Sequence, residues 1–121
     1  MSAMIREKLG EINVLCTELA DIVPPSMEVY LADKVVRAAC ERYLERIVEG
    51  LTDLAFMVIK AGRFRTPEDD RDAFSVLDEE GVIAQGLCGR LRQAKGMRNV
   101  LAHQYTRVDD RIVFKAITVD L

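Results

Sequence analysis

The sequence predicts an all-α protein, and two observations lead to this. It is rich in Ala, Leu, Glu, Arg and Val but has only 7 Gly, 3 Pro and no Trp in 121 residues, a composition typical of helices. Apolar residues recur three and four positions apart in most segments, as they do on one face of a helix. Since 50% of the residues are hydrophobic, enough for one core, we expect a single helical domain over residues 1–121.

The first helix is expected from about Ala3 to Asp21, because one apolar stripe runs along this segment. Pro24 and Pro25 follow it, and proline ends a helix because it lacks a backbone donor and clashes with the preceding turn. The stripe consists of Ile5, Leu9, Ile12, Cys16 and Leu19.

A second helix is expected from Ser26, which would cap it, to about Ala61, with Gly62 as its C-terminal stop. At about 1.5 Å per residue it would be roughly 50 Å long. This is more than a small bundle requires, so part of its surface would be available to a partner. Its apolar stripe consists of Val29, Val36, Cys40, Tyr43, Ile47, Leu51, Leu54 and Val58.

A short third helix is expected between Thr66 and Gly81. Thr66 offers a capping hydroxyl, Pro67 suits the first turn, and Asp69 lies where a carboxylate reaches back to the cap. The helix would end at Gly81. Its buried side would be Ala73, Phe74 and Leu77.

A fourth helix is expected from about Val82 to His103, and it carries the residues on which the functional interpretation depends. The final segment, Asp109 to Leu121, is apolar enough to be a fifth helix or a strand, and we favour the helix. The core face of the fourth helix is expected to consist of Ile83, Leu87, Leu91, Ala94, Met97 and Leu101.

A polar stripe that includes two glycines lies roughly opposite this core face. An exposed glycine inside a helix costs about 1 kcal/mol relative to Ala, so solvent exposure alone explains Gly89 and Gly96 poorly. Glycines seven apart on one face allow another backbone to approach closely, and we therefore expect a second copy of the chain to pack there. The stripe consists of Gln85, Gly89, Arg92, Gly96, Asn99 and His103.

Charge is distributed unevenly along the chain, although the net charge is only −3. Residues 67–80 contain seven acids and one base, Arg71, whereas residues 81–108 contain no acid and five bases. Such a run is either a solvated helix face or an electropositive surface that binds phosphates. The five bases are Arg90, Arg92, Lys95, Arg98 and Arg107.

The cysteines give no sign of a metal site or a disulfide framework. Cys16, Cys40 and Cys88 are odd in number and far apart, and no Cys/His cluster accompanies them, so we expect buried thiols, no bound metal and no cofactor. The chain has no apolar run long enough to span a membrane and no signal peptide at its start, so we expect a cytoplasmic protein without a membrane partner.

The only histidine of the chain, His103, lies in the stretch Met97-Arg98-Asn99-Val100-Leu101-Ala102-His103-Gln104-Tyr105. On a helical wheel Arg98 is about 140° from His103, and Tyr105 would be about 200° away if the helix continued. The three side chains converge only if the helix ends near His103 or if the site is shared between two chains.

Each of these residues also has an ordinary structural explanation. An imidazole in the last turn of a helix, such as that of His103, complements the helix dipole. Arg98 would lie along the edge of the core with its charge in water, and Tyr105 would be a core aromatic with its hydroxyl at the surface. Asn99 would be a polar residue on the surface of the helix without a special role.

The motif resembles the Arg-Asn-x-x-x-His-x-Tyr signature of HepT-type toxins, which belong to the HEPN superfamily. The resemblance covers nearly the whole chain. It includes the Ala-Asp-Lys-Val-Val-Arg-Ala-Ala stretch of the long helix, the acidic helix before Gly81-Val82-Ile83, and Leu91-Arg92-Gln93-Ala94-Lys95-Gly96-Met97 before the motif.

The resemblance implies an up-and-down HEPN-type bundle of about five helices that forms a two-fold dimer. It also implies a ribonuclease that cleaves RNA without a metal, as the toxin of a type VII HepT/MntA toxin–antitoxin system. The antitoxin would be an MntA-like nucleotidyltransferase that adenylylates Tyr105.

The chemistry of RNA cleavage agrees with these residue types. Arg98 and His103 would be catalytic: the imidazole transfers protons near neutral pH, and the guanidinium stabilises charge on phosphorus. Asn99, Tyr105 and Arg92 would support them by orienting His103 or binding RNA phosphate. One histidine cannot act as general acid and general base at the same time, but a two-fold dimer supplies a second histidine. The alternative is a non-catalytic HEPN binding module that partners a nucleotidyltransferase.

Overall fold

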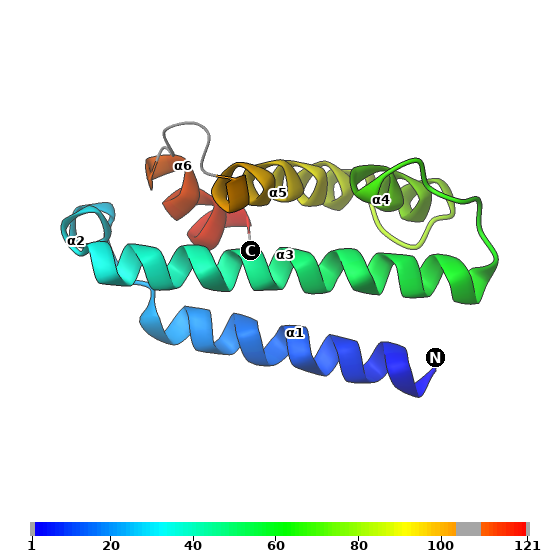
Figure 1. The fold of residues 1–121 in the computed structure, drawn as a ribbon, viewed down its shortest axis with the longest axis horizontal. Helices are drawn as coiled ribbons and strands as arrows, with labels where there is room; N and C mark the ends of the chain where they lie inside the picture. The colour runs from blue at the N-terminus through cyan, green and yellow to red at the C-terminus, as the bar shows by residue number, and fades with distance from the viewer. Residues whose placement is uncertain (1, 104–109, 121) are drawn as a thin grey trace.

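The structure is a computed structural model that describes the backbone of residues 2–103 and 110–120, and the side chains of residues 2–98 and 110–118. All elements within these ranges are helical, as the sequence predicts. Figure 1 shows α1 (Ala3–Ile22), α3 (Lys34–Gly62) and α5 (Gln85–His103) side by side, each antiparallel to its neighbour, with α3 in the middle. The predicted up-and-down bundle is thus confirmed.

Helix α1 agrees closely with its prediction. The Ser2 hydroxyl caps it by accepting a hydrogen bond from the Ile5 N–H at 3.2 Å, and the helix ends at Ile22, just before Pro24. The buried residues of α1 are Ile5, Ile12 and Leu19, all from the predicted stripe.

The single long helix expected from Ser26 to Ala61 is wrong, because it is divided into α2 (Met27–Ala32) and α3. Ser26 caps α2 as predicted, but Asp33 has an extended backbone with φ −118° and begins a new helix. Its carboxylate accepts hydrogen bonds from the N–H groups of Val35 and Val36, both at 3.1 Å. The apolar stripe continues across this break, which is why periodicity alone does not reveal it.

Replacing Asp33 by Ala is expected to lower the free energy of unfolding by about 1 kcal/mol, because the first turn of α3 loses both side-chain acceptors. Asp33→Asn keeps an acceptor and is expected to lose less. Urea denaturation of the two variants measures the difference. If Asp33→Ala unfolds at the wild-type midpoint, the Asp33 cap does not stabilise the start of α3.

The C-terminal end of α3 also differs from its prediction. Gly62 is the last helical residue, and Arg63 after it takes the left-handed conformation with φ +55°. Gly62 is needed for another reason: a Cβ there would lie 2.5 Å from Cζ of the Phe64 ring. Phe64 packs against the second of the two hydrophobic clusters described below.

Helix α4 (Asp70–Glu79) begins later than expected. Its cap is Asp69, whose carboxylate accepts from the Asp72 N–H at 2.7 Å, and not Thr66. Gly81 follows the helix at φ +73°, which supports its predicted role as the end. The buried face consists of Ala73, Phe74, Val76 and Leu77.

Helix α5 starts at Gln85 instead of Val82, and its buried face is rotated from the predicted one. Leu87 is 36% exposed, whereas Cys88 and Lys95 are only 5% exposed. The rotation arises because α5 packs against α4 as well as α3. Leu91, Ala94 and Met97 are half-buried, and the side chain of Leu101 lies outside the described residues.

The last segment forms α6 (Asp110–Lys115) and a π-helical turn, Ala116–Asp120. The predicted helix, rather than the alternative strand, is thus confirmed. Its Phe114 ring lies 5.0 Å from that of Tyr30 in α2. This contact belongs to a hydrophobic cluster of α1, α2, α3 and the C-terminal segment, while a second cluster joins α3, α4 and Cys88 of α5. Among residues 2–103 and 110–120, no helix is long and apolar enough to cross a bilayer.

Candidate functional site

Helix α5 carries most of the predicted site. Arg98, Asn99 and His103 all lie on this helix, in its last two turns. Since α5 is helical through this stretch, positions 98 and 103 are about 140° apart around its axis. Tyr105 lies outside the described residues, as do the side chains of Asn99 and His103, so their predicted convergence with Arg98 stays a prediction.

The guanidinium of Arg98 reaches toward α3. Its Nη2 lies 3.7 Å from Oε2 of Glu49, which is an ion pair too long for a hydrogen bond. The Arg98 side chain is 26% exposed, and its Nε is buried without a hydrogen-bond partner in the described part of the chain. A guanidinium has five donors in a fixed fork, so Arg98 retains donors for an anionic ligand.

Glu49 is a functional candidate that sequence reasoning did not identify. It lies 49 positions before Arg98, and nothing in the sequence links the two. Only the packing of α3 against α5 brings them together.

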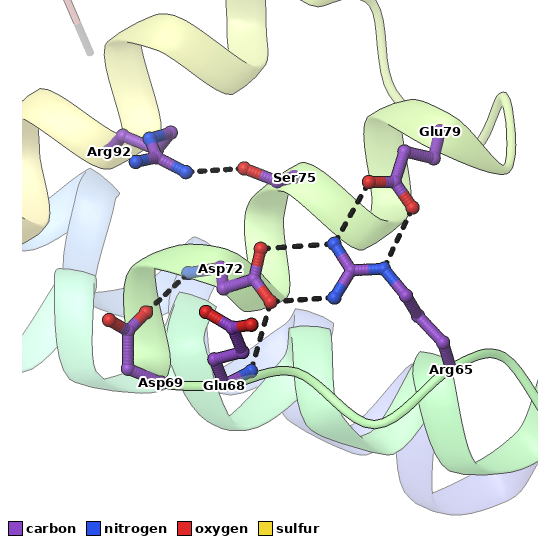
Figure 2. Close-up of polar contacts among 7 residues, drawn as sticks. All are labelled: Arg65, Glu68, Asp69, Asp72, Ser75, Glu79 and Arg92. Carbon is purple, nitrogen blue, oxygen red and sulfur yellow. Dashed lines mark hydrogen bonds and ion pairs between the residues drawn. The ribbon is translucent and has the colours of Figure 1, made fainter.

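Arg92 is held by helix α4. Its Nη1 donates a hydrogen bond to the hydroxyl of Ser75, as Figure 2 shows. This contact places the Arg92 guanidinium between α5 and the acidic helix. Its predicted contact with RNA phosphate therefore stays a prediction, and Ser75 competes for one of its donors.

The acidic run of residues 67–80 neutralises part of the basic run that follows it. Lys95 is buried and pairs with Asp70 at 3.2 Å between Nζ and Oδ2. Of the other bases on α5, Arg98 pairs with Glu49, and Arg90 has no ion pair among the described residues. The charge asymmetry is thus partly an intramolecular contact between α4 and α5.

Arg65 donates hydrogen bonds to both ends of α4, to Asp72 in its first turn and to Glu79 at its last residue, as Figure 2 shows. Its fork donates to Asp72 at 2.7 Å and 3.0 Å and to Glu79 at 2.9 Å twice. The hydrogen bonds from Arg65 and from the Glu68 N–H lower the pKa of Asp72 to about 2.

Replacing Arg65 by Gln is expected to raise the pKa of Asp72 toward its ordinary value of 3.8, because the largest stabilisation of the carboxylate is removed. A depressed carboxyl pKa contributes stability above the unfolded-state pKa, and this contribution is lost as pH falls through the folded-state value. Arg65→Gln should therefore have a lower free energy of unfolding than the wild type at pH 7. As pH drops below 4, its free energy of unfolding should fall less than that of the wild type.

An NMR titration of the Asp72 carboxyl carbon measures this pKa directly. Arg6→Gln, which removes an arginine of α1, is the matched control and should leave the Asp72 titration in place. If Asp72 titrates alike in the wild type and in Arg65→Gln, its pKa is set by other groups.

The glycine-containing stripe of α5 is partly covered within the chain. A Cβ at Gly96 would lie 4.0 Å from Cζ of Arg71 in α4, while nothing lies within 4 Å of one at Gly89. Helix α4 thus lies beside the Arg92–Gly96 part of the stripe. The expected contact with a second copy stays a prediction, with Gly89 as its open part.

Comparison with known proteins identifies the family. The family model described as "Ribonuclease HepT-like" matches residues 12–121, which include the whole Arg98–Tyr105 motif. A putative RNase of Archaeoglobus fulgidus is 35% identical over 72 residues, 58% of this chain and 52% of that protein. The mRNA nuclease HepT of Shewanella oneidensis is 28% identical over 74 residues, 61% of this chain and 56% of that protein. The matched segments span about half the length of these curated relatives.

Solved structures share the fold over nearly the whole chain. A tri-AMPylated HEPN toxin from Shewanella oneidensis in complex with MNT antitoxin has a TM-score of 0.90 at 22% identity, covering 98% of this chain and 89% of that one. YutE of Bacillus subtilis, a cytosolic protein of unknown function, has a TM-score of 0.78 at 20% identity, with coverages of 95% and 76%. With the family model spanning residues 12–121, the chain belongs to the family of HepT-like ribonucleases.

Proposed function

We propose that this protein is a metal-independent ribonuclease that acts as the toxin of a type VII toxin–antitoxin pair, with Arg98 and His103 as its catalytic residues. The observation that carries the proposal is Arg98: it opens the family motif, its side chain is partly exposed, and its buried Nε has no acceptor among the described residues. A phosphate oxygen is the acceptor that this cation suits best.

In the proposed reaction RNA supplies its own nucleophile. The 2′-oxygen attacks the adjacent phosphorus, and the bond from phosphorus to the 5′-oxygen breaks. One imidazole accepts the proton of the 2′-hydroxyl, and a second donates a proton to the leaving 5′-oxygen. Arg98 stabilises the added charge on the phosphoryl oxygens. The products are a 2′,3′-cyclic phosphate and a 5′-hydroxyl.

The second imidazole requires a second copy of the chain, because His103 is the only histidine. We propose a two-fold dimer in which both copies of His103 lie at one composite site. The two-fold axis would place the ends of the two α5 helices near each other. Asn99 and Arg92 would assist by orienting His103 and contacting RNA phosphate.

Incubation of purified protein with RNA in EDTA tests the reaction. Cleavage in the presence of the chelator is expected. If cleavage appears only with a divalent cation added, the proposed mechanism is wrong. If the protein cleaves no RNA under either condition, it is a binding module and not a nuclease.

We further propose an MntA-like nucleotidyltransferase as the partner, which would silence the toxin by adenylylating Tyr105. The added phosphate would put negative charge where RNA enters. Support comes from the family match and from the solved relative, an AMPylated HEPN toxin in complex with MNT antitoxin.

Intact-mass measurement after incubation with such an enzyme and ATP is expected to show one or more adenylyl units on the wild-type protein and none on Tyr105→Phe. RNA cleavage should fall in parallel with the modified fraction. Equal modification of Tyr105→Phe would place the acceptor at another residue.

A further inference from the structure

A cavity of about 250 Å³ lies where α3, α5 and α6 meet, apart from the contact between Arg98 and Glu49. Its lining comes from α3, α5 and α6, together with Ala116 of the π-helical turn. Most of the lining side chains are aliphatic. They are Leu44, Val48, Leu51, Leu87, Leu91, Ala94, Met97, Ile112 and Ala116.

Among the described residues of the lining, the polar side chains are two cations and one amide, namely Arg90, Lys115 and Gln93, and none is acidic. Neither Arg90 nor Lys115 has an ion pair within residues 2–98 and 110–118, in contrast to Lys95 and Arg65, which α4 neutralises. An apolar cavity with two unneutralised cations suits a ligand that joins an apolar ring to an anionic group.

The size of the cavity limits this ligand. Pockets for drug-sized molecules are typically about 300–1,000 Å³, and this one lies just below that range. It therefore has room for one nucleobase. The Gln93 amide has both a donor and an acceptor, as hydrogen bonding to the edge of a base requires.

The cavity lies next to Arg98 along α5. Arg90, Ala94 and Met97 line it at spacings of four and three, so they share one face of α5, and Arg98 directly follows Met97. A strand whose phosphate is bound by Arg98 would pass the cavity within one or two turns of the helix.

We propose that this cavity binds the base of one nucleotide of the RNA, while Arg90 and Lys115 bind the phosphate of that nucleotide. The inference rests on the proposed ribonuclease function for its ligand. It adds to that function a subsite that contacts a base and so contributes to the choice of cleavage position. The cavity should therefore bind a nucleoside monophosphate, whether it is free or part of an RNA strand.

Titration of the full chain with AMP, adenosine and inorganic phosphate, followed by methyl NMR, tests the site without requiring cleavage. AMP is expected to shift the methyl signals of Ala94 and Met97, and to bind about tenfold more tightly than adenosine, because only AMP contacts the two cations. Phosphate alone should bind weakly. If AMP leaves both methyl signals in place, the proposal is wrong.

Two sets of variants separate the parts of the site. Arg90→Gln combined with Lys115→Gln is expected to reduce AMP affinity about tenfold and leave adenosine affinity unchanged. Arg6→Gln combined with Lys60→Gln removes the same two charges elsewhere and is the matched control. Ala94→Phe fills the cavity and should abolish binding of both ligands, with a circular dichroism spectrum to confirm folding.

RNA cleavage supplies the second measurement. The Arg90/Lys115 variant should raise KM for RNA about tenfold relative to the Arg6/Lys60 control, with a smaller change in kcat. If the wild-type protein cleaves RNA and these two double variants have the same KM, the cavity does not bind the substrate. Failure of the wild-type protein to cleave RNA contradicts the proposed function alone, and the AMP titration then decides whether the cavity is a nucleotide site.

Discussion

Replacing His103 by Ala is expected to abolish RNA cleavage. In the proposed dimer the variant loses the general base and the general acid together, because both come from copies of the same residue. Each proton transfer typically contributes about 10²–10⁴-fold, so the rate should fall by about 10⁴-fold or more. Initial rates on a fluorescent oligonucleotide in EDTA measure this loss.

Asn13→Ala, which changes an exposed residue of α1, is the matched control for His103→Ala and should retain wild-type activity. Both variants should still bind RNA, because the residues proposed to contact its phosphates, Arg98 and Arg92, are unchanged. If His103→Ala cleaves RNA within tenfold of the wild-type rate, His103 transfers no proton. Its role is then structural, as an imidazole that complements the dipole at the C-terminus of a helix.

Replacing Arg98 by Ala is expected to lower kcat by about 10²–10³-fold, the usual effect of removing one donor to a developing oxyanion. Arg98→Lys should recover only part of this activity, because lysine keeps the charge but lacks the planar fork. Single-turnover rates separate this effect from RNA binding, which salt-dependent titrations measure.

Glu49 should influence activity only through Arg98, since it lies 3.7 Å from the guanidinium. Glu49→Gln is expected to change the cleavage rate severalfold in the wild-type background and not at all in Arg98→Ala. Glu45→Gln, one turn earlier on α3 and paired with Arg42 at 3.4 Å, is the matched control. Equal effects of Glu49→Gln in the two backgrounds would show that the pair has no part in catalysis.

Local signals in the sequence predict much of the fold. The Ser2 cap and the apolar stripe of α1 lie within one segment, so its bounds follow from neighbouring residues alone. The break at Asp33 was missed because apolar periodicity carries on through it, while the cap depends on the backbone conformation of one residue. Aspartate is common within helices as well as at their starts, and its presence there does not reveal a new helix.

The features that sequence reasoning missed arise from contacts between distant segments. Lys95 is predicted only as one of five bases on a solvated or phosphate-binding face, but α4 covers it and supplies Asp70 as its partner. The rotation of α5 that exposes Leu87 and buries Cys88 has the same origin. At the candidate site, the motif from Arg98 to Tyr105 is local and therefore visible in the sequence, whereas Glu49 depends on the packing of α3 against α5.

The measurement that tests the central claim most directly is the chemical identity of the RNA ends produced in EDTA. A short oligonucleotide is incubated with the protein, and its fragments are analysed by mass spectrometry. Attack by the 2′-hydroxyl predicts a 2′,3′-cyclic phosphate and a 5′-hydroxyl, with no cleavage when a 2′-deoxynucleotide replaces the one at the cut. Fragments with a 3′-hydroxyl and a 5′-phosphate, or cleavage of the deoxy-substituted strand, would contradict the mechanism.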